Sequence, residues 1–130
     1  MLKTLLFPLL ATTFALGADP APWAFLFSGT KDFWNYRHQA ETCRAYHLFK
    51  DLGVDEIVHF NFDDVSSSSD NPYRGKLYAD NHGKEVYAGC KIQYSREDVN
   101  MHNFTQALIR KGRGDGEPSR LIVYLNGIGA

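Results

Sequence analysis

Three short apolar runs are spaced along the chain, and each predicts a strand. The run Trp23–Ser28 is continuously apolar and stops at Gly29, which is typical of a strand buried on both faces. The run Ile57–Phe62 ends at a pair of aspartates and predicts a second strand. The run Leu121–Leu125 predicts a third buried strand near the end of the sequence.

Two stretches with apolar residues at three- and four-residue spacing predict helices. The first spans Asn35–Leu52, is closed by Gly53, and has an apolar stripe of Tyr36, Ala40, Cys43, Tyr46, Phe49 and Leu52. A strand, a helix and a strand of these lengths predict a right-handed βαβ unit. The second helix is expected to be capped by Asn100 and to run to Gly112, with a buried stripe of Met101, Phe104, Ala107 and Leu108.

The connections between these elements are polar. Residues 65–76 (VSSSSDNPYRGK) predict an exposed loop, and the turn Asn81–Lys84 suggests a small peripheral hairpin. The last strand follows a basic, glycine-rich connection (RKGRGDGEPSR). The pattern as a whole predicts an α/β fold with an open parallel sheet of about three core strands, whose edge and some apolar surface stay uncovered.

Composition fits one globular domain. The 130 residues include 44% apolar and 14% aromatic side chains, and the formal net charge is −1 with Lys and Arg spread along the chain. This distribution forms no basic patch for nucleic acid or an anionic membrane. A peptide or protein partner is therefore expected.

The first residues, MLKTLLFPLLATTFALGA, predict a secretory signal peptide over residues 1–17, with residues 18–130 as the mature domain. One lysine precedes a short apolar run, and small residues allow cleavage after Gly17 or Ala18. The run is short for a membrane span, and no second hydrophobic run predicts a membrane anchor. A buried N-terminal helix is the alternative interpretation. In the secretory pathway, Asn103 in the sequence Asn-Phe-Thr is a candidate glycosylation site.

Polar side chains gather where the first predicted strand leads into the first helix. Ligands of open α/β sheets bind outside the carboxyl ends of the strands, and Asn35, Arg37 and His38 lie there. An arginine fork can hold a carboxylate or an amide, and a histidine can act as donor or base. In the structural alternative, Asn35 caps the helix, Arg37 is a solvated first-turn residue and His38 lies at the surface.

The two cysteines are weak candidates for a nucleophile. Cys43 falls on the apolar stripe of the first helix, and Cys90 has a lysine neighbour but no evident base. Their spacing does not reveal whether they pair. The histidines show no metal-ligand spacing with the cysteines, so neither a metal nor another cofactor is expected.

Four segments resemble the legumain (asparaginyl endopeptidase) family of caspase-like cysteine peptidases: NYRHQAETCRAY, GVDEIVHFNFDDV, DNPYRGKLYAD and VYAGCKIQYSREDVNMHNF. The resemblance implies a caspase-like α/β fold that hydrolyses peptide bonds after Asn, with a Cys nucleophile, a His general base and an oxyanion hole. By motif, Asn35 matches the residue that orients the catalytic His, and Gly129 matches the oxyanion-hole glycine. Arg37 and His38 match residues lining the pocket for the substrate's Asn side chain.

The family's catalytic pair is not matched. Where the family has its His after the third apolar run, this chain has Ile128, which cannot take a proton. Neither Cys43 nor Cys90 matches the nucleophile. The resemblance therefore implies a truncated peptidase domain that is inactive alone. For the intact protein it implies peptide or protein substrates, cystatin-like inhibitors, and a secreted, lysosomal or vacuolar location.

Two alternatives remain open on the sequence. The chain could be a secreted noncatalytic homologue that binds peptides or inhibitors. It could also be a homologue of the catalytic subunit of glycosylphosphatidylinositol transamidase, which shares the string NYRH found at residues 35–38.

Overall fold

A three-stranded parallel sheet forms the centre of the structure, with strand order β2-β1-β3. The computed structural model describes residues 22–81, 83–114 and 120–127. The middle strand β1 (Trp23–Ser28) pairs with β2 (Glu56–Asn61) on one side and β3 (Leu121–Asn126) on the other. All three predicted strands are present, the second beginning and ending one residue earlier than predicted and the third ending one residue later. The α/β prediction is confirmed.

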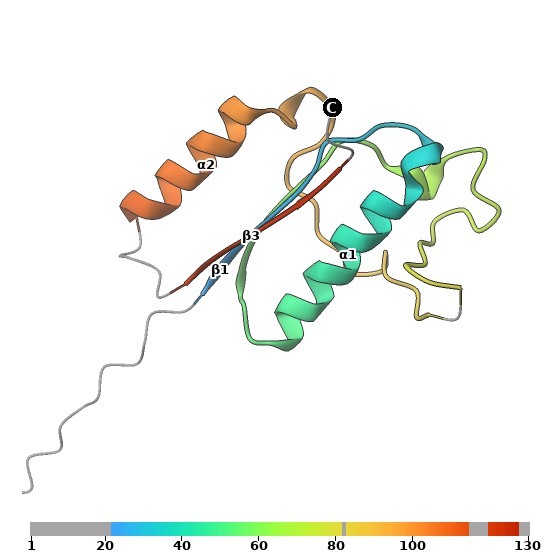
Figure 1. The fold of residues 1–130 in the computed structure, drawn as a ribbon, viewed down its shortest axis with the longest axis horizontal. Helices are drawn as coiled ribbons and strands as arrows, with labels where there is room; N and C mark the ends of the chain where they lie inside the picture. The colour runs from blue at the N-terminus through green and yellow to red at the C-terminus, as the bar shows by residue number, and fades with distance from the viewer. Residues whose placement is uncertain (1–21, 82, 115–119, 128–130) are drawn as a thin grey trace, which may run out of the picture.

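Two helices cover opposite faces of the sheet (Figure 1). Helix α1 (Tyr36–Asp51) packs against the face that carries Ala24 and Leu26, and α2 (Met101–Gly114) packs against the face that carries Phe25. The edge of the Phe104 ring meets Phe25, with ring centroids 5.8 Å apart. Successive side chains of β1 point to opposite faces of the sheet, and a helix covers each face. This explains the continuous apolar run, and the predicted burial of the strand is confirmed.

Short 3-10 helices lie at three turns: η1 (Phe33–Asn35), η2 (Val65–Ser67) and η3 (Arg96–Asp98). Helix α2 starts as predicted, because the Asn100 side-chain oxygen accepts the backbone N–H of Asn103 at 2.9 Å. The helix continues to Gly114, two residues beyond the predicted end.

Helix α1 is buried on more sides than its apolar stripe predicted. The predicted members Ala40, Cys43 and Tyr46 are buried, but Leu52 is 68% exposed. The buried set also includes His38, Gln39, Thr42 and Ala45. Their surroundings differ: Ala45 packs with the sheet residues Ala24 and Leu26, whereas the Gln39 side-chain oxygen accepts the backbone N–H of Val65 in the connection between β2 and α2 at 2.7 Å.

The first part of that connection is less exposed than predicted. Val65, Ser66 and Asn71 are buried at 5% exposure or less. The Asn71 side-chain amide donates to the carbonyl oxygens of Ser66 and Lys76, both at 3.0 Å. A polar segment can be buried when its hydrogen bonds are satisfied internally, which the prediction of an exposed loop overlooked.

The predicted hairpin is reduced to a single antiparallel bridge between Tyr78 and Glu85. The Glu85 carboxylate accepts the backbone N–H groups of Leu77, Tyr87 and Ala88. The Glu85 side chain therefore supplies three of the hydrogen bonds of this segment, beside a cross-strand backbone bond from the Val86 N–H to the Leu77 carbonyl oxygen at 2.8 Å.

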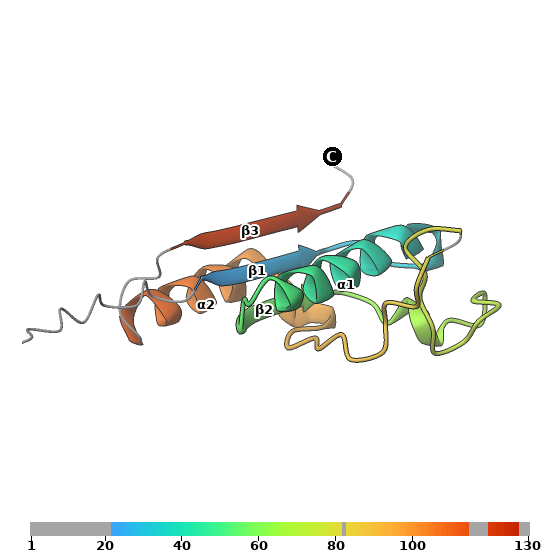
Figure 2. The same ribbon diagram turned by 90° about the horizontal axis from the view of Figure 1, so that it is seen from below.

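The third strand is an exposed edge and not the buried strand that was predicted (Figure 2). Ile122 and Tyr124 pack into the cluster beneath α1. On the opposite face, Leu121, Val123 and Leu125 are 49%, 45% and 67% exposed. That face is open because the buried contacts of α2 are with β1 and β2. The expectation of an uncovered edge and uncovered apolar surface is confirmed.

Candidate functional site

The candidate site lies at the carboxyl edge of the sheet, where the loop after β1 meets the start of α1 and the end of β3. The backbone carbonyl of His38 accepts the side-chain amide of Asn126 at 3.4 Å, which joins α1 to the last residue of β3. A methyl group added at Gly127 would lie 3.8 Å from Cγ2 of Thr30. The fold therefore brings three separate segments together at this edge, as expected for an open α/β sheet.

Asn35 stands at the junction between η1 and α1. It occupies the N-cap position of α1 but makes no side-chain capping bond. Its Nδ2 instead donates to the carbonyl oxygen of Lys31 at 2.7 Å. Because the nitrogen is held by a carbonyl, the side-chain oxygen is the part of Asn35 that can accept a further N–H group. Asn35 is therefore the N-cap residue of α1 by position, as the structural alternative has it, but its side chain does not make the capping bond.

His38 is almost completely buried, at 4% exposure, so the alternative of a surface histidine is wrong. Its Nδ1 lies 2.8 Å from the Thr30 hydroxyl, and its Nε2 receives the Nε–H of Arg37 at 3.3 Å. Burial lowers the pKa of the His38 ring below its usual value, and the Arg37 charge lowers it further. The ring is therefore neutral near pH 7.

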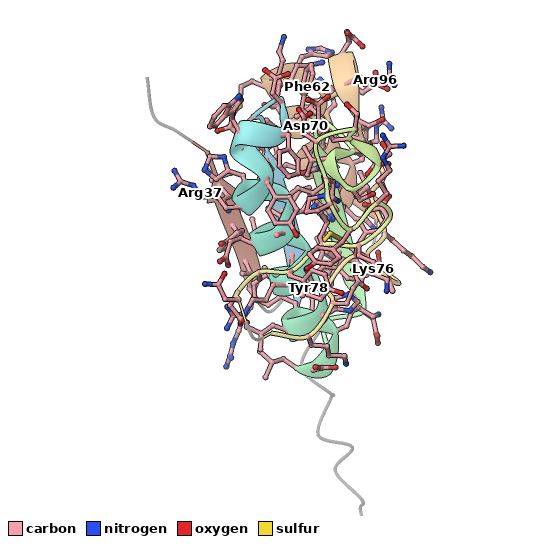
Figure 3. The ribbon with its side chains drawn as sticks, turned by 90° about the vertical axis from the view of Figure 1, so that its right-hand side faces the viewer. Arg37, Phe62, Asp70, Lys76, Tyr78 and Arg96 are labelled. Atoms are coloured by element: carbon pink, nitrogen blue, oxygen red, sulfur yellow. A yellow bond between two sulfur atoms is a disulfide. The ribbon has the colours of Figure 1, made fainter. Side chains whose placement is uncertain are left out.

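Arg37 is exposed and projects from the first turn of α1 (Figure 3). It lines an open cleft of about 990 Å³ together with Phe33, Tyr36, Asn71, Pro72, Tyr73, Tyr78, Ala79, Asp80, Asn81 and Gly83. Among the described residues, no carboxylate forms a salt bridge with Arg37. A guanidinium in this setting can offer its N–H groups to a planar oxygen-bearing ligand.

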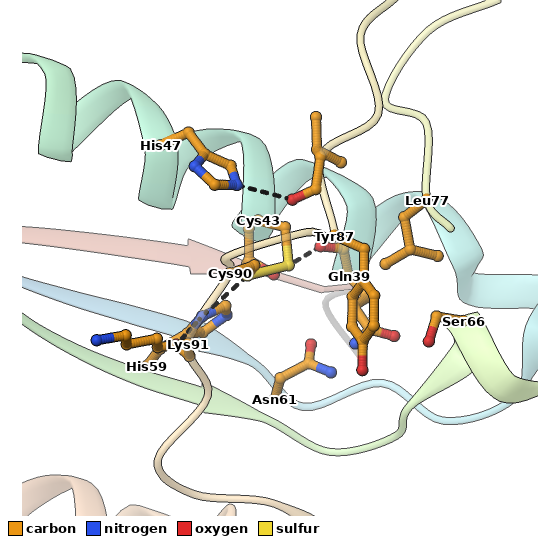
Figure 4. The surroundings of a disulfide bond; sticks show 12 residues. Gln39, Cys43, His47, His59, Asn61, Ser66, Leu77, Tyr87, Cys90 and Lys91 are labelled. Carbon is orange, nitrogen blue, oxygen red and sulfur yellow. Dashed lines mark hydrogen bonds between the residues drawn. A yellow bond between two sulfur atoms is a disulfide. The ribbon is translucent and has the colours of Figure 1, made fainter. Parts of the chain in front are cut away.

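The two cysteines form a disulfide, which the sequence had left undecided (Figure 4). It joins Cys43 in the middle of α1 to Cys90 in the connection, with Cα atoms 5.4 Å apart. His59 of β2 lies beside it, with Nδ1 3.7 Å from the Cys90 sulfur. Since both sulfur atoms are bonded to each other, neither is a thiolate nucleophile in this state.

Several predicted features fall outside the described residues: the signal peptide at residues 1–17, Ile128 and the oxyanion-hole candidate Gly129. Asn103 lies in the first turn of α2, where its Nδ2 donates to the carbonyl oxygen of Asp98 at 3.0 Å. Within the part of the chain that the structure describes, no group of three or more His, Cys, Asp or Glu side chains could hold a metal ion. Neither described helix combines the length and apolarity needed to cross a bilayer.

Sequence analysis missed Thr30 and Asn126 as members of this site. Both contact His38. Thr30 follows a strand end, a position that indicates proximity to a ligand site, but only the path of the loop shows which side chain it meets. Asn126 comes directly after the predicted third strand, so its position gave the same signal as that of Thr30.

The chain is a member of the Peptidase C13 family, whose model matches residues 22–122. This confirms the resemblance to legumain-type cysteine endopeptidases.

Curated relatives agree with this assignment. A hemoglobinase of Schistosoma japonicum is 39% identical over 76% of this chain and 24% of its own length. A vacuolar-processing enzyme delta-isozyme of Arabidopsis thaliana is 37% identical over 71% of this chain, and a legumain of Pongo abelii is 37% identical over 73%. The matched segment makes up 20% and 22% of these two relatives, so the chain spans about a fifth to a quarter of the proteins it matches.

Proposed function

We propose that this chain is the substrate-recognition part of a cysteine endopeptidase that cleaves peptide bonds after Asn. The observation that carries the proposal is Arg37, an exposed residue with no salt bridge among the described residues, on an open cleft between the start of α1 and residues 71–83 of the connection. Its N–H groups can bind the side-chain oxygen of a substrate Asn. Peptide or protein substrates fit the family, and inhibitors that present an Asn side chain would use the same contact.

The other site residues have roles around the scissile bond in this proposal. The Asn35 side-chain oxygen would accept an N–H of the catalytic imidazole and hold the ring in place. The backbone N–H of Gly129 would stabilise the oxyanion that forms on the carbonyl. The imidazole and the thiolate must come from outside this sequence, because Ile128 stands at the His position and both cysteines are used in the disulfide.

The chain alone is therefore proposed to bind peptides without cutting them. A secreted noncatalytic homologue that binds peptides or inhibitors is the second candidate, and the disulfide does not distinguish it from the first, because neither cysteine matches the family's nucleophile. The two candidates share the same binding site and differ in whether a thiolate and a general base join it.

Binding can be measured by fluorescence anisotropy with a labelled peptide that contains one Asn. We expect Arg37→Met to weaken binding by roughly tenfold or more, since a hydrogen bond to a charged donor contributes about 1.5 to 3 kcal/mol. Arg44→Met is the matched control, because Arg44 is an exposed arginine of the same helix that lines a different cleft. Equal binding by both variants, or by a peptide with Leu in place of Asn, would refute the proposed recognition.

Hydrolysis is tested with a fluorogenic peptide that carries Asn before the scissile bond. We expect no rate above the blank, with or without a thiol reductant, because a reduced cysteine would still lack the family's base. Cleavage that appears on reduction and is lost on Cys90→Ala would show that the proposed inactivity is wrong.

We also propose that the chain enters the secretory pathway through residues 1–17, reaches a secreted, lysosomal or vacuolar location, and is glycosylated at Asn103. In the folded helix the Asn103 amide is bonded to Asp98 and the Thr105 hydroxyl to Met101, so the glycan must be added before α2 forms. Protein secreted from eukaryotic cells should lose mass on treatment with an N-glycosidase, and Asn103→Gln should abolish the shift. An unchanged mass in the untreated and treated protein would contradict this prediction.

A further inference from the structure

The contacts of His38 define a hydrogen-bond chain with one direction. A guanidinium can only donate, so His38 Nε2 is the acceptor of the Arg37 Nε–H at 3.3 Å. A neutral imidazole carries one proton, which must then be on Nδ1. The Nδ1–H accordingly donates to the Thr30 hydroxyl oxygen, 2.8 Å away.

The three side chains differ in their exposure. Arg37 is exposed, Thr30 is half-buried and His38 is 4% exposed. Both ring nitrogens of His38 are occupied by its two neighbours. The buried ring therefore holds the Arg37 side chain through its Nε–H, and of the three residues only Arg37 lines the cleft.

We propose that Thr30 is a positioning residue for ligand recognition: by holding the His38 proton on Nδ1, it keeps Nε2 as the acceptor that orients Arg37. This inference rests on the proposed function, in which Arg37 binds the substrate's Asn side chain. With its Nε–H used by His38, Arg37 keeps the terminal N–H groups of its fork for the ligand. The fork suits the oxygen of a planar amide or carboxylate group.

Loss of the Thr30 hydroxyl would change which ring nitrogen of His38 carries the proton. If Nδ1 loses its acceptor, the proton is no longer favoured there and can move to Nε2. An Nε2–H would then point at the Nε–H of Arg37, and two donors repel each other. The guanidinium would lose its fixed orientation, and ordering it again on binding would reduce the affinity.

The test compares Thr30→Val, which removes the hydroxyl at nearly constant volume, with Thr30→Ser, which keeps it. The chain is labelled with ¹⁵N at histidine, and the chemical shifts of the His38 ring nitrogens report which one carries the proton. We expect the Nδ1–H form in the unsubstituted chain and in Thr30→Ser, and a shift toward the Nε2–H form in Thr30→Val. Binding of the Asn-containing peptide should weaken roughly tenfold in Thr30→Val and recover in Thr30→Ser.

A second variant tests the hydrogen bonds of His38 from the Arg37 side. Arg37→Met removes the donor to Nε2, so the preference for the Nδ1–H form should weaken although Thr30 is intact. An unchanged tautomer in both Thr30→Val and Arg37→Met would overturn the proposal. If the tautomer shifts as expected but the unsubstituted chain does not bind the peptide, the positioning role of Thr30 stands and the proposed function fails.

Discussion

Reduction of the Cys43–Cys90 disulfide is expected to lower the free energy of unfolding by about 4 kcal/mol. The two cysteines are 47 residues apart in sequence. When the disulfide is broken, a loop of that length is no longer closed in the unfolded chain. The conformational entropy of the unfolded chain rises, and this rise lowers the free energy of unfolding by about 4 kcal/mol. A domain of this size has a total stability of about 5 to 15 kcal/mol, so the bond is a large fraction of the total.

The reduced chain still has contacts that hold the connection to α1. The Tyr36 hydroxyl accepts the backbone N–H of Tyr78 at 2.6 Å, and His47 Nε2 donates to the carbonyl oxygen of Val86 at 3.0 Å. The buried side chains of Leu77 and Val86 also pack in the same cluster as Cys43. We therefore expect a folded but less stable protein rather than an unfolded one.

Urea denaturation with and without a thiol reductant measures the effect. The variant Cys43→Ala/Cys90→Ala is the control, because its unfolding midpoint should not respond to the reductant. It should also be less stable than the reduced chain, since Cys43 is completely buried and its truncation leaves a cavity. Identical midpoints for the oxidised and reduced unsubstituted chain would contradict the prediction.

The central elements of the fold could be predicted because local patterns determine them. The run Trp23–Ser28 has no polar face, as its position between two helices requires, and Asn100 caps α2 as its residue type suggested. Asn35, Arg37 and His38, which lie at the start of α1, could be assigned to the carboxyl edge of the sheet because the order of elements fixes which edge they reach. These inferences need only periodicity, capping chemistry and the handedness of a βαβ unit.

The remaining features depend on how distant segments pack. Leu121–Leu125 has the composition of a buried strand, but whether a helix covers its second face is not a property of the strand. The disulfide depends on the path of the connection over α1, which the spacing of Cys43 and Cys90 does not encode. The contact between Thr30 and His38 likewise arises from the shape of one loop.

His59 makes the stability of this fold sensitive to acid. It lies in β2 with no exposed surface, and its ring stacks on Tyr46. Its Nδ1 donates to the carbonyl oxygen of Lys91 at 3.1 Å, and within the described structure its buried Nε2 has no hydrogen-bond partner. Burial lowers the pKa of His59 from 6.5 to about 4, although the bond to the Lys91 carbonyl opposes this shift.

The sign of the pH effect follows from the lowered pKa. The unfolded chain binds a proton at His59 as the pH falls through about 6.5, whereas the folded chain resists it until about pH 4. Stability from this residue is therefore complete above pH 6.5 and is lost between pH 6.5 and 4, by about 3 kcal/mol in total. His38 acts in the same direction, because burial and the Arg37 charge also lower its pKa.

Urea midpoints between pH 7.5 and 4 should fall steeply for the unsubstituted chain and less steeply for His59→Asn. Asparagine does not titrate, and its amide nitrogen can replace Nδ1 as the donor to Lys91. His102→Gln, at an exposed position of α2, is the matched control and should keep the steep profile. If His59→Asn is as acid-sensitive as the control, the buried ring is not the cause. If its profile is flatter, the buried His59 ring is the group that makes the folded chain sensitive to acid.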